Sequence, residues 1–104
     1  MRNIEYLNIT STEFLEESVI LFSFNNEWQQ EDIKQLSKLI IAQLLGVSTI
    51  EHVQGADREM VRIWWQQGYF VLNFEYYSQS CWLEAEDENS REKLGFLYQQ
   101  LLNF

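Results

Sequence analysis

Apolar and polar residues alternate most regularly between Arg58 and Glu86, and this alternation predicts three antiparallel strands joined by two tight turns. Every second position in these strands is apolar, so one face of the predicted sheet is entirely hydrophobic. The residues on that face include Val61, Ile63, Trp65, Phe70, Leu72, Phe74, Cys81, Leu83 and Ala85. The rest of the chain is expected to pack around this three-stranded unit.

Two turn positions define the predicted register. Gln67-Gly68 is the first, because glycine supplies the positive φ that two-residue hairpin turns need, and it sets Trp65 opposite Phe70. Ser78-Gln79 is the second. A shift of one residue in either hairpin would turn the apolar side chains to the opposite face.

Three further segments have strand character. Residues 4–9 alternate weakly and predict a strand whose facing the pattern does not decide, and residues 10–17 have the form of a capping box, which favours a short helical turn, although a plain loop is equally compatible. Ser18–Phe24 is almost wholly apolar, as expected of a strand in the middle of a sheet. Val47–Gln54 predicts a less regular strand.

Residues 27–45 and 89–103 repeat apolar side chains at helical spacing. Asn26 precedes the first segment and Asn89 begins the second, and asparagine is a favoured cap. The order strand, strand, helix, four strands, helix predicts an α+β two-layer sandwich. A mainly antiparallel sheet of five or six strands would carry both helices on its apolar face. With 104 residues, no proline and no linker, we expect one domain spanning residues 1–104.

Charge narrows the range of partners. The formal net charge is −9, and the seven basic residues are scattered from Arg2 to Lys93. Nucleic acid and anionic membranes are therefore not expected as partners, because both require clustered cations. One cysteine excludes a disulfide within the chain, and no apolar run approaches the length of a membrane span. We expect a cytoplasmic soluble protein.

The sequence shows no catalytic or metal-binding pattern. His52 is the only histidine and is interpreted as a partly exposed polar residue, while Cys81 alternates with core positions and is interpreted as an inert small hydrophobe. The acidic run after Ala85 leads into a helix start, where negative charge is stabilising. All four glycines are isolated, so no phosphate cradle is predicted. We therefore expect no cofactor, no metal and no enzymatic activity.

The competing hypothesis is a small enzyme that uses Glu75 and Glu84. In the predicted register Glu75 lies opposite Trp82, and Asn73 lies opposite Glu84. The two carboxylates would then be diagonal neighbours on adjacent strands and could titrate as a pair.

The sheet face opposite the helices is the predicted working surface. It would carry Met60, Arg62, Trp64, Val71, Glu75 and Trp82. Tryptophan, methionine and arginine are enriched in interface cores, so the expected partner is a protein. A homodimer through stacked sheets is the first hypothesis, and a basic partner held by the acidic rim, as in small inhibitor or immunity proteins, is the alternative. Both fail if another part of the chain closes this face.

One resemblance supports this picture. The run GYFVLNFEYYSQSCWLEAED, preceded by ADREMVRIWW, resembles a small bacterial family of uncharacterised proteins that share an aromatic strand, a serine-containing turn and a Trp-Leu-Glu strand. It covers about the middle third of the chain. The resemblance implies a compact bacterial intracellular domain and transfers no catalytic or binding residue.

Overall fold

The computed structural model describes residues 7–102 and has the predicted α+β architecture. Six strands form one sheet in the spatial order β1-β2-β6-β5-β4-β3, and every neighbouring pair is antiparallel. The strands are β1 (Ile9–Leu15), β2 (Val19–Phe24), β3 (Ser48–Gln54), β4 (Arg58–Trp65), β5 (Gly68–Glu75) and β6 (Ser80–Ala85). The helices are the 3-10 turn η2 (Gln30–Asp32), α1 (Ile33–Ile41), α2 (Glu88–Arg91) and α3 (Leu94–Leu102).

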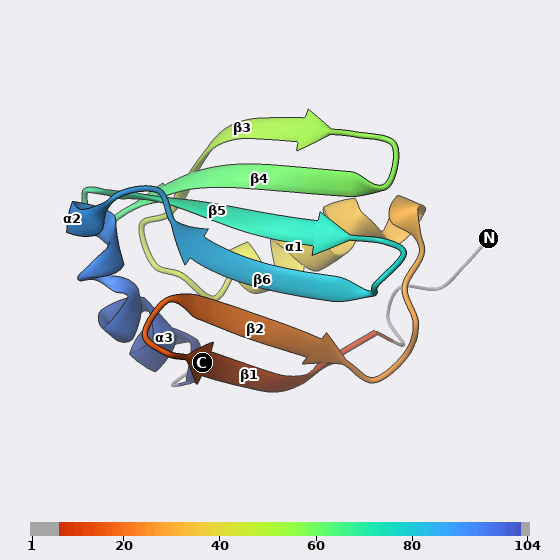
Figure 1. Ribbon diagram of the computed structural model, residues 1–104, viewed down its shortest axis with the longest axis horizontal. Helices are drawn as coiled ribbons and strands as arrows, with labels where there is room; N and C mark the ends of the chain where they lie inside the picture. Colours follow the sequence, from red (N-terminus) through yellow and green to blue (C-terminus); the bar gives the residue numbers. More distant parts are fainter. Residues whose placement is uncertain (1–6, 103–104) are drawn as a thin grey trace.

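The sheet and the helices form two layers. Figure 1 looks onto the uncovered side of the sheet, with α1 behind β5 and β6 and with α3 behind the lower edge. α3 packs against β1 and β2, and α2 packs against β5 and β6. The core between the layers contains Trp65, Phe70, Leu72 and Phe74, none of them more than 3% exposed. Their predicted burial is confirmed.

The β4–β5 hairpin turns one residue earlier than the sequence suggested. Trp65 pairs with Gly68, and the turn consists of Gln66 and Gln67, whose φ angles of 51° and 62° both lie in the left-handed region. The predicted Gln67-Gly68 turn is therefore wrong. Glycine is needed at position 68 for space, because a Cβ there would lie 2.9 Å from the ring of Phe70.

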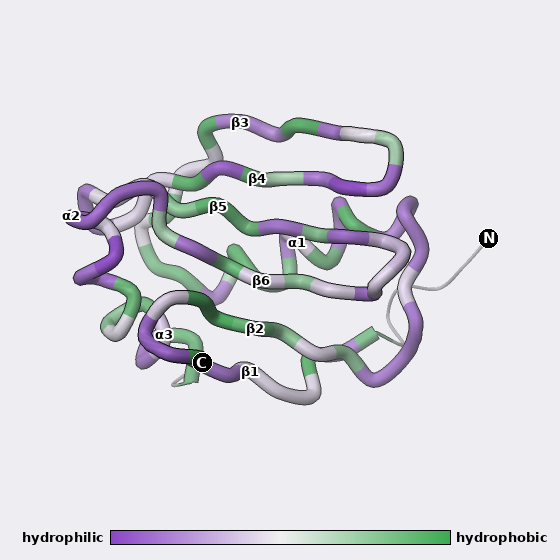
Figure 2. Tube along the Cα trace, in the orientation of Figure 1, coloured by the Kyte–Doolittle hydropathy of each residue, from purple (hydrophilic) through white to green (hydrophobic). Residues whose placement is uncertain are grey.

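This change moves the register of the hairpin by two residues, and the second hairpin moves in the same way. Phe74 pairs with Cys81 and Glu75 pairs with Ser80, so the loop contains residues 76–79 and not the predicted Ser78-Gln79 turn alone. A two-residue shift leaves every side chain on its predicted face, because side chains alternate with a period of two. Figure 2 shows this alternation of hydrophobic and hydrophilic segments along the central strands.

The N-terminal prediction is wrong in its boundaries. β1 begins at Ile9, so residues 10–15, expected as a helical turn or loop, form an edge strand. Residues 4–6 of the predicted strand over residues 4–9 lie outside the described residues, and of the other three only Ile9 is in a strand. Tertiary contacts explain the difference: the rings of Phe14 and Tyr98 lie 5.3 Å apart, and the Tyr98 hydroxyl donates to the carbonyl of Thr12. The segments 18–24 and 47–54 are strands, as predicted.

The first helix begins later and ends earlier than predicted, and the residues that precede the two helical segments differ from the predicted caps. Gln29, not Asn26, precedes the first helix, and its N–H donates to Asp32 Oδ2 at 2.8 Å. Asp87, not Asn89, caps the second by accepting the N–H of Ser90 at 2.7 Å. The second helical segment is interrupted after residue 91 and resumes at residue 94.

Candidate functional site

The structure brings the six predicted interface residues together on the uncovered face of the sheet. Met60, Arg62 and Trp64 come from β4, Val71 and Glu75 from β5, and Trp82 from β6. Arg62 pairs with Val71 across the two strands, and Asn73 is paired with Met60 on one side and Trp82 on the other. We call this surface, made by residues of β1 to β6 that point away from the helices, the open face.

An aromatic cluster occupies one end of the open face. The rings of Trp64 and Tyr69 are 4.8 Å apart, and the guanidinium carbon of Arg62 lies 4.7 Å from the centre of the Tyr69 ring. Arg62 thus makes a cation–π contact, which holds its long side chain flat on the sheet. Sequence reasoning missed Tyr69, although its alternation with Val71 places it on this face.

Beyond the cluster, apolar side chains continue diagonally across the sheet. Val71 follows Tyr69 on β5, Trp82 lies one step further on β6, and Leu21 of β2 pairs with Trp82. Diagonal neighbours on adjacent strands are within reach of aromatic side chains. We call Trp64, Tyr69, Val71, Trp82 and Leu21 the diagonal band. All five are neither fully buried nor fully exposed.

The charged residues of the open face form pairs within the chain. Arg62 binds Glu86 through two contacts, one of them 2.9 Å between Nη2 and Oε2. Arg58 binds Glu75 across the strand pair, and this contact, helped by the Ser78 hydroxyl, lowers the pKa of the Glu75 carboxyl. The arginines therefore bring no uncompensated positive charge to the face.

Glu84 has a different partner. One of its carboxylate oxygens accepts the Asn73 side-chain amide at 3.2 Å. Asn73 is buried, and its amide also donates to the carbonyl of Val71. The Glu84 carboxylate consequently receives its hydrogen bond from a neutral group, whereas Glu75 and Glu86 are paired with arginines.

The structure separates the two carboxylates of the enzyme hypothesis. Glu75 pairs with Ser80 and Glu84 with Val71, so the Asn73–Trp82 pair lies between them. The prediction that Glu75 and Glu84 are diagonal neighbours is wrong, because the register differs by two residues. Their partners also differ, which removes the basis for a coupled pair.

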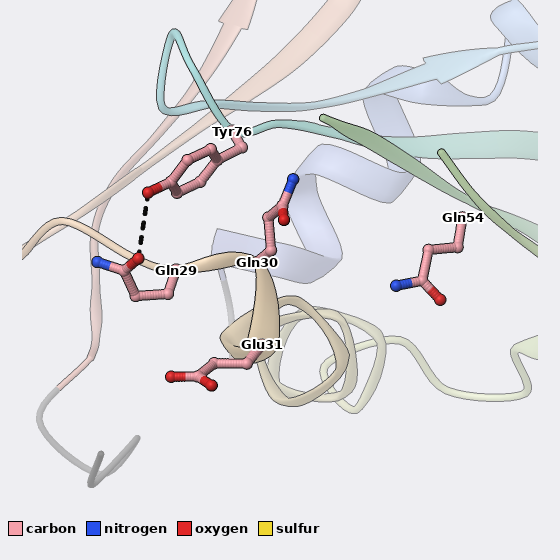
Figure 3. Close-up of a pocket in the computed structure, with 5 residues that line it drawn as sticks. All are labelled: Gln29, Gln30, Glu31, Gln54 and Tyr76. Carbon is pink, nitrogen blue, oxygen red and sulfur yellow. Dashed lines mark hydrogen bonds between the residues drawn. The ribbon is translucent and has the colours of Figure 1, made fainter. Parts of the chain in front are cut away.

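A polar cavity of about 470 Å³ lies beside the start of the first helix. Its lining residues, drawn in Figure 3, are Gln29, Gln30, Glu31, Gln54 and Tyr76. The Tyr76 hydroxyl donates to Gln29 Oε1 at 3.1 Å, and the Gln30 amide donates to the Ala56 carbonyl. Glu31 points away from Gln54, so the polar groups do not converge on one point. These contacts anchor η2 to the sheet and do not assemble a reactive group.

His52 and Glu59 form a contact that sequence reasoning missed. Their side chains meet at 2.6 Å between His52 Nε2 and Glu59 Oε2. His52 is 39% exposed, as expected of a partly exposed residue, but Glu59 is only 7% exposed. Glu59 lies on the same side of β4 as the core residues Val61, Ile63 and Trp65. An acidic residue at a position that alternates with core residues could have predicted this buried carboxylate. A buried carboxylate needs a partner, which His52 supplies.

The remaining candidates offer no reactive or metal-binding geometry. Burial raises the pKa of the Cys81 thiol well above its ordinary value, which disfavours the reactive thiolate. Within residues 7–102, no group of three or more His, Cys, Asp or Glu side chains is placed to hold a metal ion. None of the helices in this part of the chain is long and apolar enough to cross a membrane.

Comparison with known proteins identifies a family and no activity. Searches of curated proteins and of solved structures gave no match. The family model described as a protein of unknown function, DUF3630, matches residues 9–102. This match extends far beyond the middle third that carried the resemblance, and it begins and ends with β1 and α3. The predicted relation to an uncharacterised family is confirmed, and the chain belongs to the DUF3630 family.

Proposed function

We propose that this domain is a non-catalytic protein-binding module whose open face docks onto a second copy of the same chain. The observation that carries the proposal is the diagonal band on the side of the sheet away from the helices. Apolar surface of this kind on a monomer marks an interaction site. A twofold axis through the band would stack aromatic residues of one copy on those of the other. Cytoplasmic location belongs to the same proposal.

The neutral diagonal band allows a second copy to dock despite the negative net charge of each chain. Each chain carries a net charge of −9, so two copies repel one another at long range. The diagonal band itself contains no charged residue, and the adjacent arginines are paired with Glu75 and Glu86 of their own chain. Docking band against band buries mainly neutral surface and leaves Glu13 and Glu51 on the two edge strands, where salt screens the repulsion; Glu84, which pairs with Val71, is the acidic residue that would lie beside the interface.

The oligomeric state tests this proposal. Light scattering and sedimentation across a hundredfold concentration range should show a monomer–dimer equilibrium. Trp64→Glu and Trp82→Glu each place a charge in the band and should raise the dimer Kd by roughly thirtyfold or more, the effect of losing a hot-spot residue. Leu39→Glu is the matched control, because it places the same charge on an exposed apolar residue of α1.

Two results would contradict the homodimer. The wild-type chain could remain monomeric over the whole concentration range, or Trp64→Glu could dimerise as tightly as Leu39→Glu does. Circular dichroism of every variant shows that the comparison is made between folded proteins.

Glu84 favours a second candidate, a basic protein partner. Its carboxylate is bonded to an amide and not to a cation, and Glu51 and Glu13 extend the acidic rim along β3 and β1. Complementary charge increases the association rate and makes it dependent on salt. This candidate predicts a monomer whose complex with a basic protein weakens with added salt and with Glu84→Gln. Unchanged binding by that variant would exclude it.

A further inference from the structure

A second cavity, separate from the open face, lies where the β4–β5 turn meets α3. It has a volume of about 430 Å³ and is lined by Trp65, Gln66, Lys93, Phe96 and Gln100. Cavities of a few hundred Å³ with aromatic walls and a few polar groups are the usual form of small-molecule sites. The Trp65 side chain points to the helix layer, so the cavity and the diagonal band are on opposite sides of the sheet.

The two aromatic residues have different roles in the cavity. Trp65 is almost completely buried, and its indole N–H donates to the Leu45 carbonyl at 3.0 Å, which fixes the ring as a rigid wall. Phe96 is 74% exposed on the first turn of α3. A flat apolar group bound beside Trp65 would cover part of Phe96 and remove its surface from water.

Lys93 is the only charged residue among the five that line the cavity. Its ammonium donates to the Gln66 carbonyl at 2.9 Å, which uses one of its three N–H groups. Within residues 7–102 it forms no ion pair, although the chain has 16 acidic residues. Asp87 is the acid whose charge it influences, and that carboxylate is bonded mainly to Ser90.

Two neighbouring cavities provide a contrast. Both are lined by Arg91, and both also contain acidic side chains, among them Glu88 in each case. The cavities at Arg91 therefore contain acidic side chains, whereas none of the residues that line the cavity at Lys93 is acidic. A cation in a cavity that no carboxylate lines favours the binding of an anion there.

The amide groups complete the lining. Gln66 has a left-handed backbone with φ of 51°, in a turn where Asn and Gly are the residues that fit without strain. Gln66 is one of the residues that line the cavity, and its carbonyl accepts the Lys93 ammonium. Gln100 Oε1 accepts the Leu45 N–H at 2.9 Å, so the remaining hydrogen-bonding group of that side chain is its NH₂ donor.

We propose that this cavity binds a small organic carboxylate with a flat apolar body. The apolar body would lie between Trp65 and Phe96, and the carboxylate would receive hydrogen bonds from Lys93 and from the amide of Gln100. The proposal does not depend on self-association through the open face.

Titration with 4-phenylbutyrate and with the neutral 4-phenylbutanol tests the proposal. Backbone amide NMR shifts should be confined to residues 65–68 and 93–100, and the acid should bind at least tenfold more tightly than the alcohol. Lys93→Met should weaken the acid about tenfold and leave the alcohol unchanged, and Lys93→Arg should keep the preference for the acid. Phe96→Ala should weaken both probes about tenfold.

Lys38→Met is the matched control, since it removes a cation from the exposed side of α1 and should not alter either titration. Equal affinity for the acid and the alcohol would overturn the proposal, as would shifts centred elsewhere on the protein. Lys93 also bonds to the β4–β5 turn, so the NMR spectrum of Lys93→Met without ligand is compared with that of the wild type to detect a change in the turn. Phe96→Ala tests the site without removing this bond. Trp82→Glu should bind both probes normally, which separates this site from the dimer proposal.

Discussion

Trp64 and Trp65 are adjacent in the sequence and lie on opposite faces of the same strand. Trp65 is 3% exposed beneath the helices, while Trp64 lies partly exposed on the open face against Tyr69. The difference shows that coverage by the helices, and not residue type, decides which tryptophan belongs to the core. Both helices lie on one side of the sheet, so the other face keeps apolar residues that no described element covers.

Among the strand residues that the structure describes, each face of the sheet has one buried polar residue. On the helix side this is Glu59, which is bonded to His52 near the edge of the sheet. On the open face it is Asn73, whose amide is bonded to Glu84 and to the Val71 carbonyl. Both satisfy the rule that buried polar groups are hydrogen bonded, but Glu59 depends on a single side chain from the exposed strand β3.

The largest expected effect is the loss of stability on removing a ring from the core, compared with removing one from the open face. Phe74→Ala removes a fully buried ring that packs edge-on against Trp28, and should lower the free energy of unfolding by about 3–5 kcal/mol. Trp82→Ala removes a larger ring from the open face and should cost about 1–2 kcal/mol, because that residue is only partly buried. Urea unfolding monitored by circular dichroism measures both. Equal losses would show that the open face is also part of the core.

A smaller loss of stability is expected when Glu59, the buried polar residue on the helix side of the sheet, loses its partner. His52→Ala leaves the Glu59 carboxylate buried without its partner and should lower the free energy of unfolding by about 1–3 kcal/mol. His52→Ala combined with Glu59→Met should recover most of this loss, because the buried charge is then absent. Gln54→Ala, on the same strand and exposed, is the control. A loss no greater than that of the control would mean that water replaces His52 as the partner.

The smallest expected effect is the pH dependence supplied by the open face. The Arg58 contact lowers the pKa of Glu75 in the folded state, so Glu75 binds protons less readily there than in the unfolded chain. Its contribution to stability is present above the unfolded-state pKa of about 4.3 and is lost as the pH falls below it. Arg58→Met should therefore make the urea midpoint depend less on pH in this range. The same dependence in variant and wild type would contradict this assignment.

The sequence alone predicted the α+β class, the strands β2 to β6 in outline, and the side on which each residue of β4 to β6 points. These features depend on a period of two along a strand and on apolar stripes along helices, which are local properties of the chain. The open face followed from the same pattern, since two helices with single apolar stripes cover only one side of a sheet. Glu75, Trp82 and the other expected interface residues were placed correctly for that reason.

Tertiary structure decided between alternatives that fit the local sequence pattern equally well. A register shifted by two residues keeps every side chain on its face, so alternation could not distinguish the true pairing of Trp65 with Gly68 from the predicted one with Phe70. The space around Phe70 is tight, because a Cβ at position 68 would lie 2.9 Å from its ring, and this contact exists only in the folded protein. β1, the contact between His52 and Glu59, and the cavity at Lys93 likewise arise from residues distant in the sequence, and their energies exist only once the chain has folded.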